Sequence, residues 1–195
     1  MLITGGMGFI GSHLTERLAQ TGARIAVASK PGNNKRIKNI NFGDNIEFLG
    51  GDLRDPEFAH HCTRNKEIVL HFASKIAGLG YNSKHPAEMM TYNTILDLQV
   101  LQSSAQNNVP LFFYPSGALV YDRDVSHPVS EEASTSGEPV DACKGASGAK
   151  RAVEKAILFF REEYPMDIMI GRLSNLYGPG DDIDPDTAHL IGNTI

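Results

Sequence analysis

Apolar residues occur along this chain in two patterns, short continuous runs and positions at helical spacing. Short apolar runs bounded by turn residues are typical of strands covered on both faces, whereas apolar positions three or four apart indicate helices. The short runs predict strands at 1–3, 24–28, 46–50, 68–72, 111–115 and 167–172. The helical spacing predicts a helix containing Ile10, Leu14 and Leu18, and two long helices at 89–107 and 149–164.

Strands that alternate with helices imply right-handed crossovers between parallel strands. The predicted fold class is therefore α/β, a Rossmann-type doubly wound parallel sheet with helices on both faces. In such sheets ligands bind at the carboxyl ends of the strands, so the loops that follow the strands are where functional residues are expected.

The first of these loops has the spacing Gly-x-x-Gly-x-x-Gly, between the first strand and the first helix. Glycines tolerate unusual backbone angles and allow a phosphate to approach the main chain, and a helix start offers unpaired N–H groups. We expect a dinucleotide to bind here; the alternative is a turn that serves only helix–strand packing. The candidate cofactor-binding residues in this turn are Gly5, Gly8, Phe9, Ile10 and Gly11.

Composition excludes several other functions. The formal net charge is −5 and, apart from residues 35–38, the basic residues are scattered, which argues against a nucleic-acid groove. No stretch approaches the ~20 apolar residues of a membrane span and no leader precedes the first strand, so a cytoplasmic protein is expected. Cys62 and Cys143 lack the Cys-x-x-Cys spacing, so we expect no disulfide and no metal site.

Five further motifs follow the later strands in order. They lie at 51–55 (GDLRD), 71–78 (HFASKIAG), Asn93, 113–121 (FYPSGALVY) and 172–179 (RLSNLYGP). With the glycine turn, these motifs resemble the extended short-chain dehydrogenase/reductase family, in particular its NAD(P)-dependent nucleotide-sugar epimerases, dehydratases and reductases. The loops at 77–86 and 180–189 are most similar to the branch that contains GDP-fucose synthetase and GDP-mannose 3,5-epimerase.

The resemblance implies roles for individual residues. Asp52 would accept a hydrogen bond from the adenine amino group, or alternatively cap a turn, and Leu53 would pack on the adenine ring. The ribose and pyrophosphate would be lined by Phe72, Ala73, Ser74 and Lys75, although Lys75 could equally be a surface residue, and Asn93 and Lys150 would complete the cofactor site. Asn175 would face the diphosphate of a nucleotide-sugar substrate. His189 matches an acid of the fucose synthetase branch, or is a surface or packing residue.

The end of the second strand bears on the choice of cofactor. Enzymes that use NAD commonly have an acidic residue there, which binds the ribose 2′-hydroxyl. This chain has Ser29 followed by Lys30, and an ammonium would attract a 2′-phosphate rather than repel it. The cofactor is therefore NAD or NADP, with a slight preference for NADP unless Lys30 is simply solvated.

The catalytic positions depart from the family pattern. The family uses a Ser or Thr after the fifth strand and a Tyr-x-x-x-Lys pair whose Lys lowers the pKa of the Tyr. The hydroxyl position here is Gly117, with Ser116 adjacent. If Lys150 is the family's Lys, then Ala146 occupies the Tyr position. If Cys143 is aligned with the Tyr instead, Ser147 falls on the Lys.

Cys143 is therefore a candidate base, with simple packing as the alternative. It lies seven helical residues from Lys150, ~10 Å along the axis, which is too far for direct coupling. The catalytic candidates are Lys150, Ser116, Cys143 and His189, with Ser116 also contacting substrate.

Domain organisation and assembly also follow from the resemblance. Residues 1–178 are expected to form the NAD(P)-binding domain, and 179–195 the start of a substrate-binding region that is otherwise missing. The chain would be either a fragment or a shortened binding domain. A homodimer through the two long helices is expected. Two functions remain open: a nucleotide-sugar epimerase, dehydratase or reductase that transfers hydride at a sugar carbon, and a catalytically impaired NAD(P)-binding protein with a sensing or scaffolding role.

Overall fold

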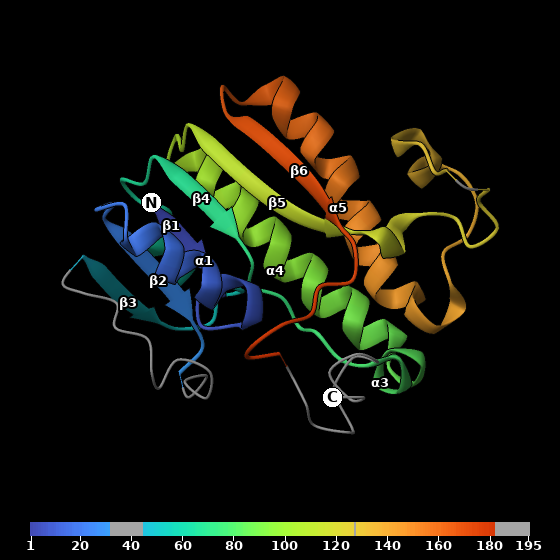
Figure 1. The fold of residues 1–195 in the computed structure, drawn as a ribbon. Helices are drawn as coiled ribbons and strands as arrows, with labels where there is room; N and C mark the ends of the chain where they lie inside the picture. The colour runs from blue at the N-terminus through green and yellow to red at the C-terminus, as the bar shows by residue number, and fades with distance from the viewer. Residues whose placement is uncertain (32–44, 127, 182–195) are drawn as a thin grey trace.

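The computed structural model describes residues 1–31, 45–126 and 128–181, and it contains one parallel sheet (Figure 1). The six strands are β1 (Leu2–Thr4), β2 (Ile25–Ser29), β3 (Ile46–Gly50), β4 (Ile68–His71), β5 (Leu111–Gly117) and β6 (Asp167–Leu173). Their order is β3-β2-β1-β4-β5-β6 and every neighbouring pair is parallel. The order reverses between β1 and β4, so the crevice at the carboxyl ends of these two strands is the expected ligand site.

Helices cover the two faces of the sheet unequally. α2 (Pro56–Thr63), α4 (Pro86–Gln106) and α5 (Lys144–Glu163) pack on one face, over a core that includes Leu2, Val69 and Phe112. On the other face α1 (Phe9–Ala19) packs over Ile3, Ile25 and Val27. Alternate residues of β1 thus point into opposite cores, as the period of two in a strand requires.

All six predicted strands are present within two residues of their expected ends, and the predicted Rossmann-type sheet is confirmed. The prediction that each strand is covered on both faces is wrong for the edge strand β3, where Phe48 is 50% exposed. The helix predicted at 149–164 begins earlier, at Lys144, and α4 begins at Pro86 rather than 89. Two short helices, α2 and α3 (Leu79–Lys84), were not predicted.

Local contacts explain why α2 forms. Its N-terminus is capped by Asp55, whose carboxylate accepts hydrogen bonds from the backbone N–H groups of Glu57 and Phe58. Pro56 occupies the first helical position, where its missing N–H costs nothing. Ala59 and Cys62 then lie on the buried side.

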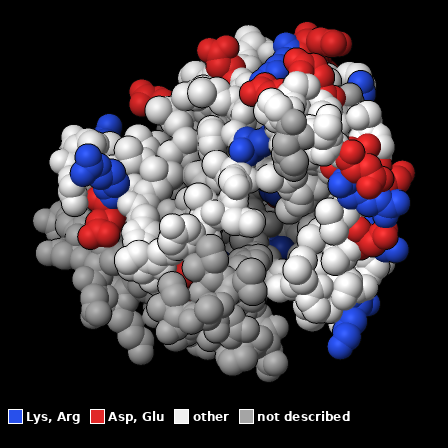
Figure 2. Space-filling view, turned by 45° about the vertical axis from the view of Figure 1, so that its right-hand side comes forward, with Lys and Arg blue, Asp and Glu red and all other residues white. Residues whose placement is uncertain are grey.

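The described surface carries mixed charge. On the face drawn in Figure 2, basic and acidic residues lie close to one another and no broad area carries a single sign. Within the described ranges, no helix is long and apolar enough to cross a membrane. Both cysteines are free, and no group of three His, Cys, Asp or Glu side chains in the described part of the chain could hold a metal ion.

Candidate dinucleotide site

The glycine turn connects β1 to α1 and is closed by its own backbone. Gly5 has φ of +65°, a conformation that favours glycine, and its N–H donates to the carbonyl of Ala28 at 2.8 Å. A Cβ at Gly5 would lie 2.6 Å from the backbone N of Ala73. A Cβ at Gly11 would lie 2.2 Å from the carbonyl oxygen of Gly5. Gly5 and Gly11 therefore hold β1, α1 and the end of β4 in close contact.

Gly8 differs from the other two glycines because it is less tightly packed. A Cβ there would meet only the carbonyl oxygen of Gly5, at 3.1 Å. Gly8 is the N-cap of α1, and no described side chain caps that helix end. The first N–H groups of a helix have no partner inside the helix, so those of Phe9 and Ile10 are the donors that this helix start offers to a ligand. This arrangement fits the pyrophosphate of a dinucleotide.

Asn93 of α4 fixes the loop after β4. Its Oδ1 accepts from Ser74 Oγ at 3.0 Å and from the backbone N–H of Lys75 at 2.8 Å. Its Nδ2 donates to the carbonyls of Lys75 and Met89. These hydrogen bonds fix the shape of the loop at 73–75. The ammonium of Lys75 pairs with Glu88, so this residue is not simply solvated.

A charged cluster occupies the edge beyond β2 and β3. Asp52 binds the guanidinium of Arg54 through both oxygens and lies 3.2 Å from Nζ of Lys30. The hydrogen bonds from Arg54 hold the pKa of Asp52 well below its usual range. Arg54 also lies 4.2 Å above the ring of Tyr92, and Lys30 lies 5.0 Å from it. Lys30, which follows half-buried Ser29, and Arg54 therefore both pair with Asp52 where an adenosine ribose is expected.

Two expectations for the adenine subsite need revision. The Oδ1 of Asp52 accepts from the backbone N–H of Arg54, which is the turn-capping alternative, and its side-chain contacts are to cations. Leu53 is 4% exposed and belongs to the main core, so almost none of its surface is left for an adenine ring. Its apolar side chain was better explained by burial than by ligand contact.

Lys150 lies on α5 with its ammonium directed at the sheet. Nζ lies 3.3 Å from Oδ2 of Asp97 and 4.4 Å from the centre of the Tyr114 ring. The hydroxyl of Tyr114 donates to the same Oδ2 at 2.7 Å. Burial, followed by the charge of Asp97, raises the pKa of Tyr114 far above its usual value. Tyr114 therefore remains protonated, and it does not replace the phenol that is absent at Ala146.

Two further catalytic candidates within the described residues, Cys143 and Ser116, have surroundings that do not favour a base. Cys143 is the N-cap of α5, and burial raises the pKa of its thiol, opposite to what a base requires. Packing is thus the better interpretation of Cys143. Ser116 is 4% exposed, and its hydroxyl has no hydrogen-bond partner among the described residues. Gly117, at the end of β5, carries no side-chain hydroxyl.

The segment after β6 returns across the carboxyl edge of the sheet toward α1 (Figure 1). His13 of α1 lies 2.7 Å from the carbonyl oxygen of Pro179, and Phe9 lies beside Gly178. Asn175 is exposed in this segment. His189 lies outside the described residues.

Sequence reasoning missed Arg54, Tyr92, His71 and Asp97. The signal for Asp97 was present, since a carboxylate at the core spacing of Asn93, Leu96, Val100 and Leu101 is unusual. Arg54 pairs with Asp52 in its own loop, but the partners of Asp97, His71 and Tyr92 come from other elements, and no spacing within the chain reveals those contacts.

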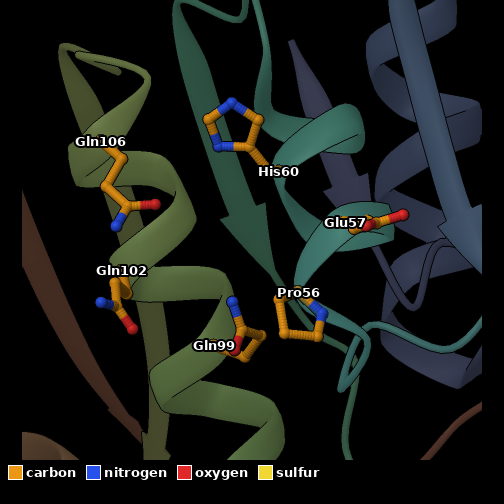
Figure 3. Close-up of a pocket in the computed structure, with 6 residues that line it drawn as sticks. All are labelled: Pro56, Glu57, His60, Gln99, Gln102 and Gln106. Carbon is orange, nitrogen blue, oxygen red and sulfur yellow. The ribbon is translucent and has the colours of Figure 1, made fainter.

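A separate groove of about 420 Å³ lies between α2 and α4. Figure 3 shows Pro56, Glu57 and His60 on α2, across from three glutamines on α4, Gln99, Gln102 and Gln106. These six residues include no Lys or Arg and none of the glycine turn. The groove is therefore distinct from the candidate dinucleotide site.

Several known proteins are similar to this chain in sequence and in structure. The GDP-mannose 3,5-epimerase 1 of Oryza sativa subsp. indica is 28% identical over 181 residues, which cover 91% of this chain and 46% of that protein. The UDP-glucose 4-epimerase of Thermotoga maritima, solved with UDP-glucose, superposes with a TM-score of 0.84 and 27% identity, covering 98% of this chain and 60% of that one. The Thermus thermophilus UDP-glucose 4-epimerase complex with NAD gives a TM-score of 0.79 at 26% identity, covering 94% and 57%.

The chain spans about half the length of the curated relatives it matches. The match to the NAD dependent epimerase/dehydratase family extends over residues 1–195. The chain therefore belongs to the NAD dependent epimerase/dehydratase family.

Proposed function

We propose that this chain is the NAD(P)-binding part of a nucleotide-sugar epimerase, dehydratase or reductase. The observation that carries the proposal is the uncapped N-terminus of α1 behind the open face of Gly8, at the point where the strand order reverses. The cofactor would supply hydride exchange at a sugar carbon. Residues 1–178 would hold it, and Asn175 and the segment from 179 would face the sugar nucleotide.

Calorimetry with NAD and NADP tests cofactor binding directly. Bound cofactor is then mixed with GDP- and UDP-sugars while the absorbance of reduced nicotinamide is followed. We expect saturable binding of at least one dinucleotide. No binding at millimolar cofactor would contradict the proposal.

A second function is favoured by the catalytic positions. No phenol stands at Ala146, Gly117 lacks a hydroxyl, and the thiol of Cys143 has a raised pKa. These features support a catalytically impaired NAD(P)-binding protein with a sensing or scaffolding role. Such a protein would bind dinucleotide with no reduction of cofactor by any sugar nucleotide even in a chain extended by the C-terminal part of a relative, whereas an enzyme extended in this way would show at least a single turnover.

We propose further that NADP is preferred over NAD. Lys30, which follows Ser29 in the chain, and Arg54 place two cations beside one carboxylate, Asp52. Charge-assisted contacts to a 2′-phosphate would strengthen binding, and Lys30→Glu is expected to reverse the preference by about tenfold or more. The ratio of the two dissociation constants checks this. A wild-type chain that binds NAD more tightly would contradict it.

We also propose that two copies pair through α4 and α5. Both helices expose large apolar side chains, Met90 and Ile95 on α4 and Leu158 and Phe159 on α5. Sedimentation should show a dimer, and Ile95→Glu with Phe159→Glu should shift it to monomer. Met169→Glu is the matched control, because Met169 is equally exposed but lies on β6. A wild-type monomer over a wide concentration range would refute the pairing.

A further inference from the structure

A chain of buried polar groups connects the end of β1 to α5. The hydroxyl of Thr4 accepts a hydrogen bond from the backbone N–H of Ala73 and lies 2.7 Å from Nδ1 of His71. Nε2 of His71 lies 3.0 Å from Oδ1 of Asp97. The other oxygen of Asp97, Oδ2, lies 3.3 Å from Nζ of Lys150. The polar chain thus links the candidate cofactor loop to the ammonium of Lys150.

Asp97 is the centre of this chain because both of its oxygens are used. A carboxylate only accepts, so His71 donates through Nε2, and its Nδ1 accepts from the Thr4 hydroxyl. The side chain of Asp97 is fully buried. Burial acts to raise its pKa, but the charge of Lys150 and the hydrogen bonds from His71 and Tyr114 outweigh this and hold the pKa below its usual value. Asp97 is therefore a carboxylate, and Lys150 is the cation that balances it.

Asp97 and Lys150 lie in the half of the sheet that is expected to bind the second nucleotide of a dinucleotide. In a sheet with this strand order, each βαβαβ half binds one nucleotide of the cofactor. Lys30 and Asp52 follow β2 and β3 in the first half. Lys150 contacts Asp97 and the ring of Tyr114 on β5, in the second half. Its side chain is 15% exposed, so it is not completely enclosed by the protein.

We propose that Asp97 is a positioning residue, which holds the charge of Lys150 beside the second nucleotide of the cofactor. The inference rests on the proposed cofactor binding and adds to it the residue that fixes Lys150. Without the carboxylate, the ammonium would be left buried and unpaired, and it would turn to solvent or lose its proton. Either change removes the charge from the second half of the site and leaves the first half unaltered.

The experiment compares two ligands on the same variants. The intact dinucleotide, in whichever form the wild type binds, occupies both halves, whereas ADP lacks the second nucleotide. We expect Asp97→Asn to weaken dinucleotide binding by about tenfold, because hydrogen bonds to charged groups have this strength. ADP affinity should change by less than about twofold. Glu154→Gln is the matched control, since it neutralises another buried carboxylate of this layer, the partner of Arg172, without touching Lys150.

A second variant separates positioning from general destabilisation. Lys150→Met should weaken dinucleotide binding to the same degree, and Asp97→Asn should have no further effect in the Lys150→Met background. The double variant also keeps the test available if Asp97→Asn alone does not fold, because it removes both buried charges together.

Three results would overturn the proposal: equal losses for ADP and dinucleotide, additive effects of the two substitutions, or unchanged dinucleotide binding in Asp97→Asn. A wild-type chain that binds no dinucleotide would instead refute cofactor binding itself, and this inference with it. Wild-type binding with an unchanged Asp97→Asn variant refutes the positioning role alone.

Discussion

Gly8→Val is expected to abolish dinucleotide binding in a chain that still folds, whereas Gly11→Val is expected to damage the fold itself. A Cβ at Gly8 meets one atom, the Gly5 carbonyl oxygen at 3.1 Å, so the protein can accommodate it with a small shift. A branched side chain there would fill the space beside the uncapped start of α1, where a pyrophosphate must approach the main chain. The loss of affinity should be about a hundredfold or more.

Gly11→Val differs because its Cβ would lie 2.2 Å from the backbone of Gly5. Overpacking of this kind typically costs about 1–3 kcal/mol, and here three backbone atoms of Gly5 and Gly6 would lie within 2.8 Å of the new Cβ, so a much larger shift is needed than at Gly8. Calorimetric affinities and thermal melting of both variants provide the comparison. Gly80→Val is the control, since a Cβ at Gly80 meets nothing within 4 Å. If Gly8→Val keeps normal affinity, the pyrophosphate does not lie on this turn.

The sheet could be predicted from the sequence because its strands are short apolar runs. Val69 and Phe112 illustrate the reason, since both are almost completely buried and a polar residue at such a position needs a hydrogen-bond partner inside the protein. The helices were harder to delimit. α5 begins with Lys144 and Gly145, and its first turns contain two glycines, which hid its start. In the structure Gly145 is required by packing, because a Cβ there would lie 2.1 Å from the carbonyl of Pro86.

The candidate site was predictable only where one segment forms it. The glycine turn is contiguous, so its spacing was informative, and its geometry agrees with the expected cradle. The pairing of Asp97 with His71, Tyr114 and Lys150 joins four separate elements. Its energetics depend on burial and on distances across the fold, which a sequence alone does not contain. Leu53 shows the converse error, because its apolar character suited both ligand contact and core packing.

The second large effect concerns catalysis: this chain is expected to convert nucleotide sugars very slowly or not at all. Ala146 and Lys150 are four residues apart on α5, so a phenol at 146 would be a neighbour of the ammonium. No described group takes its place. The hydroxyl of Tyr114 donates to Asp97 within the core, and the hydroxyl of Ser116 is buried. General acid–base catalysis typically contributes 10²–10⁴-fold, so its loss should raise the barrier by ~3–5 kcal/mol.

Gly117→Ser with Ala146→Tyr tests this explanation. A Cβ at Gly117 has its nearest contact at 3.6 Å, with Leu119, so the serine should fit without strain. In a chain extended by the C-terminal part of a relative, the double variant should gain hydride exchange with a GDP- or UDP-sugar. The same extended chain with Gly117 and Ala146 unchanged is the control. Dinucleotide affinity should be similar in the two chains because it depends on the glycine turn. Substantial turnover by the unmodified chain that persists in Cys143→Ala and Lys150→Ala would place the catalytic centre elsewhere.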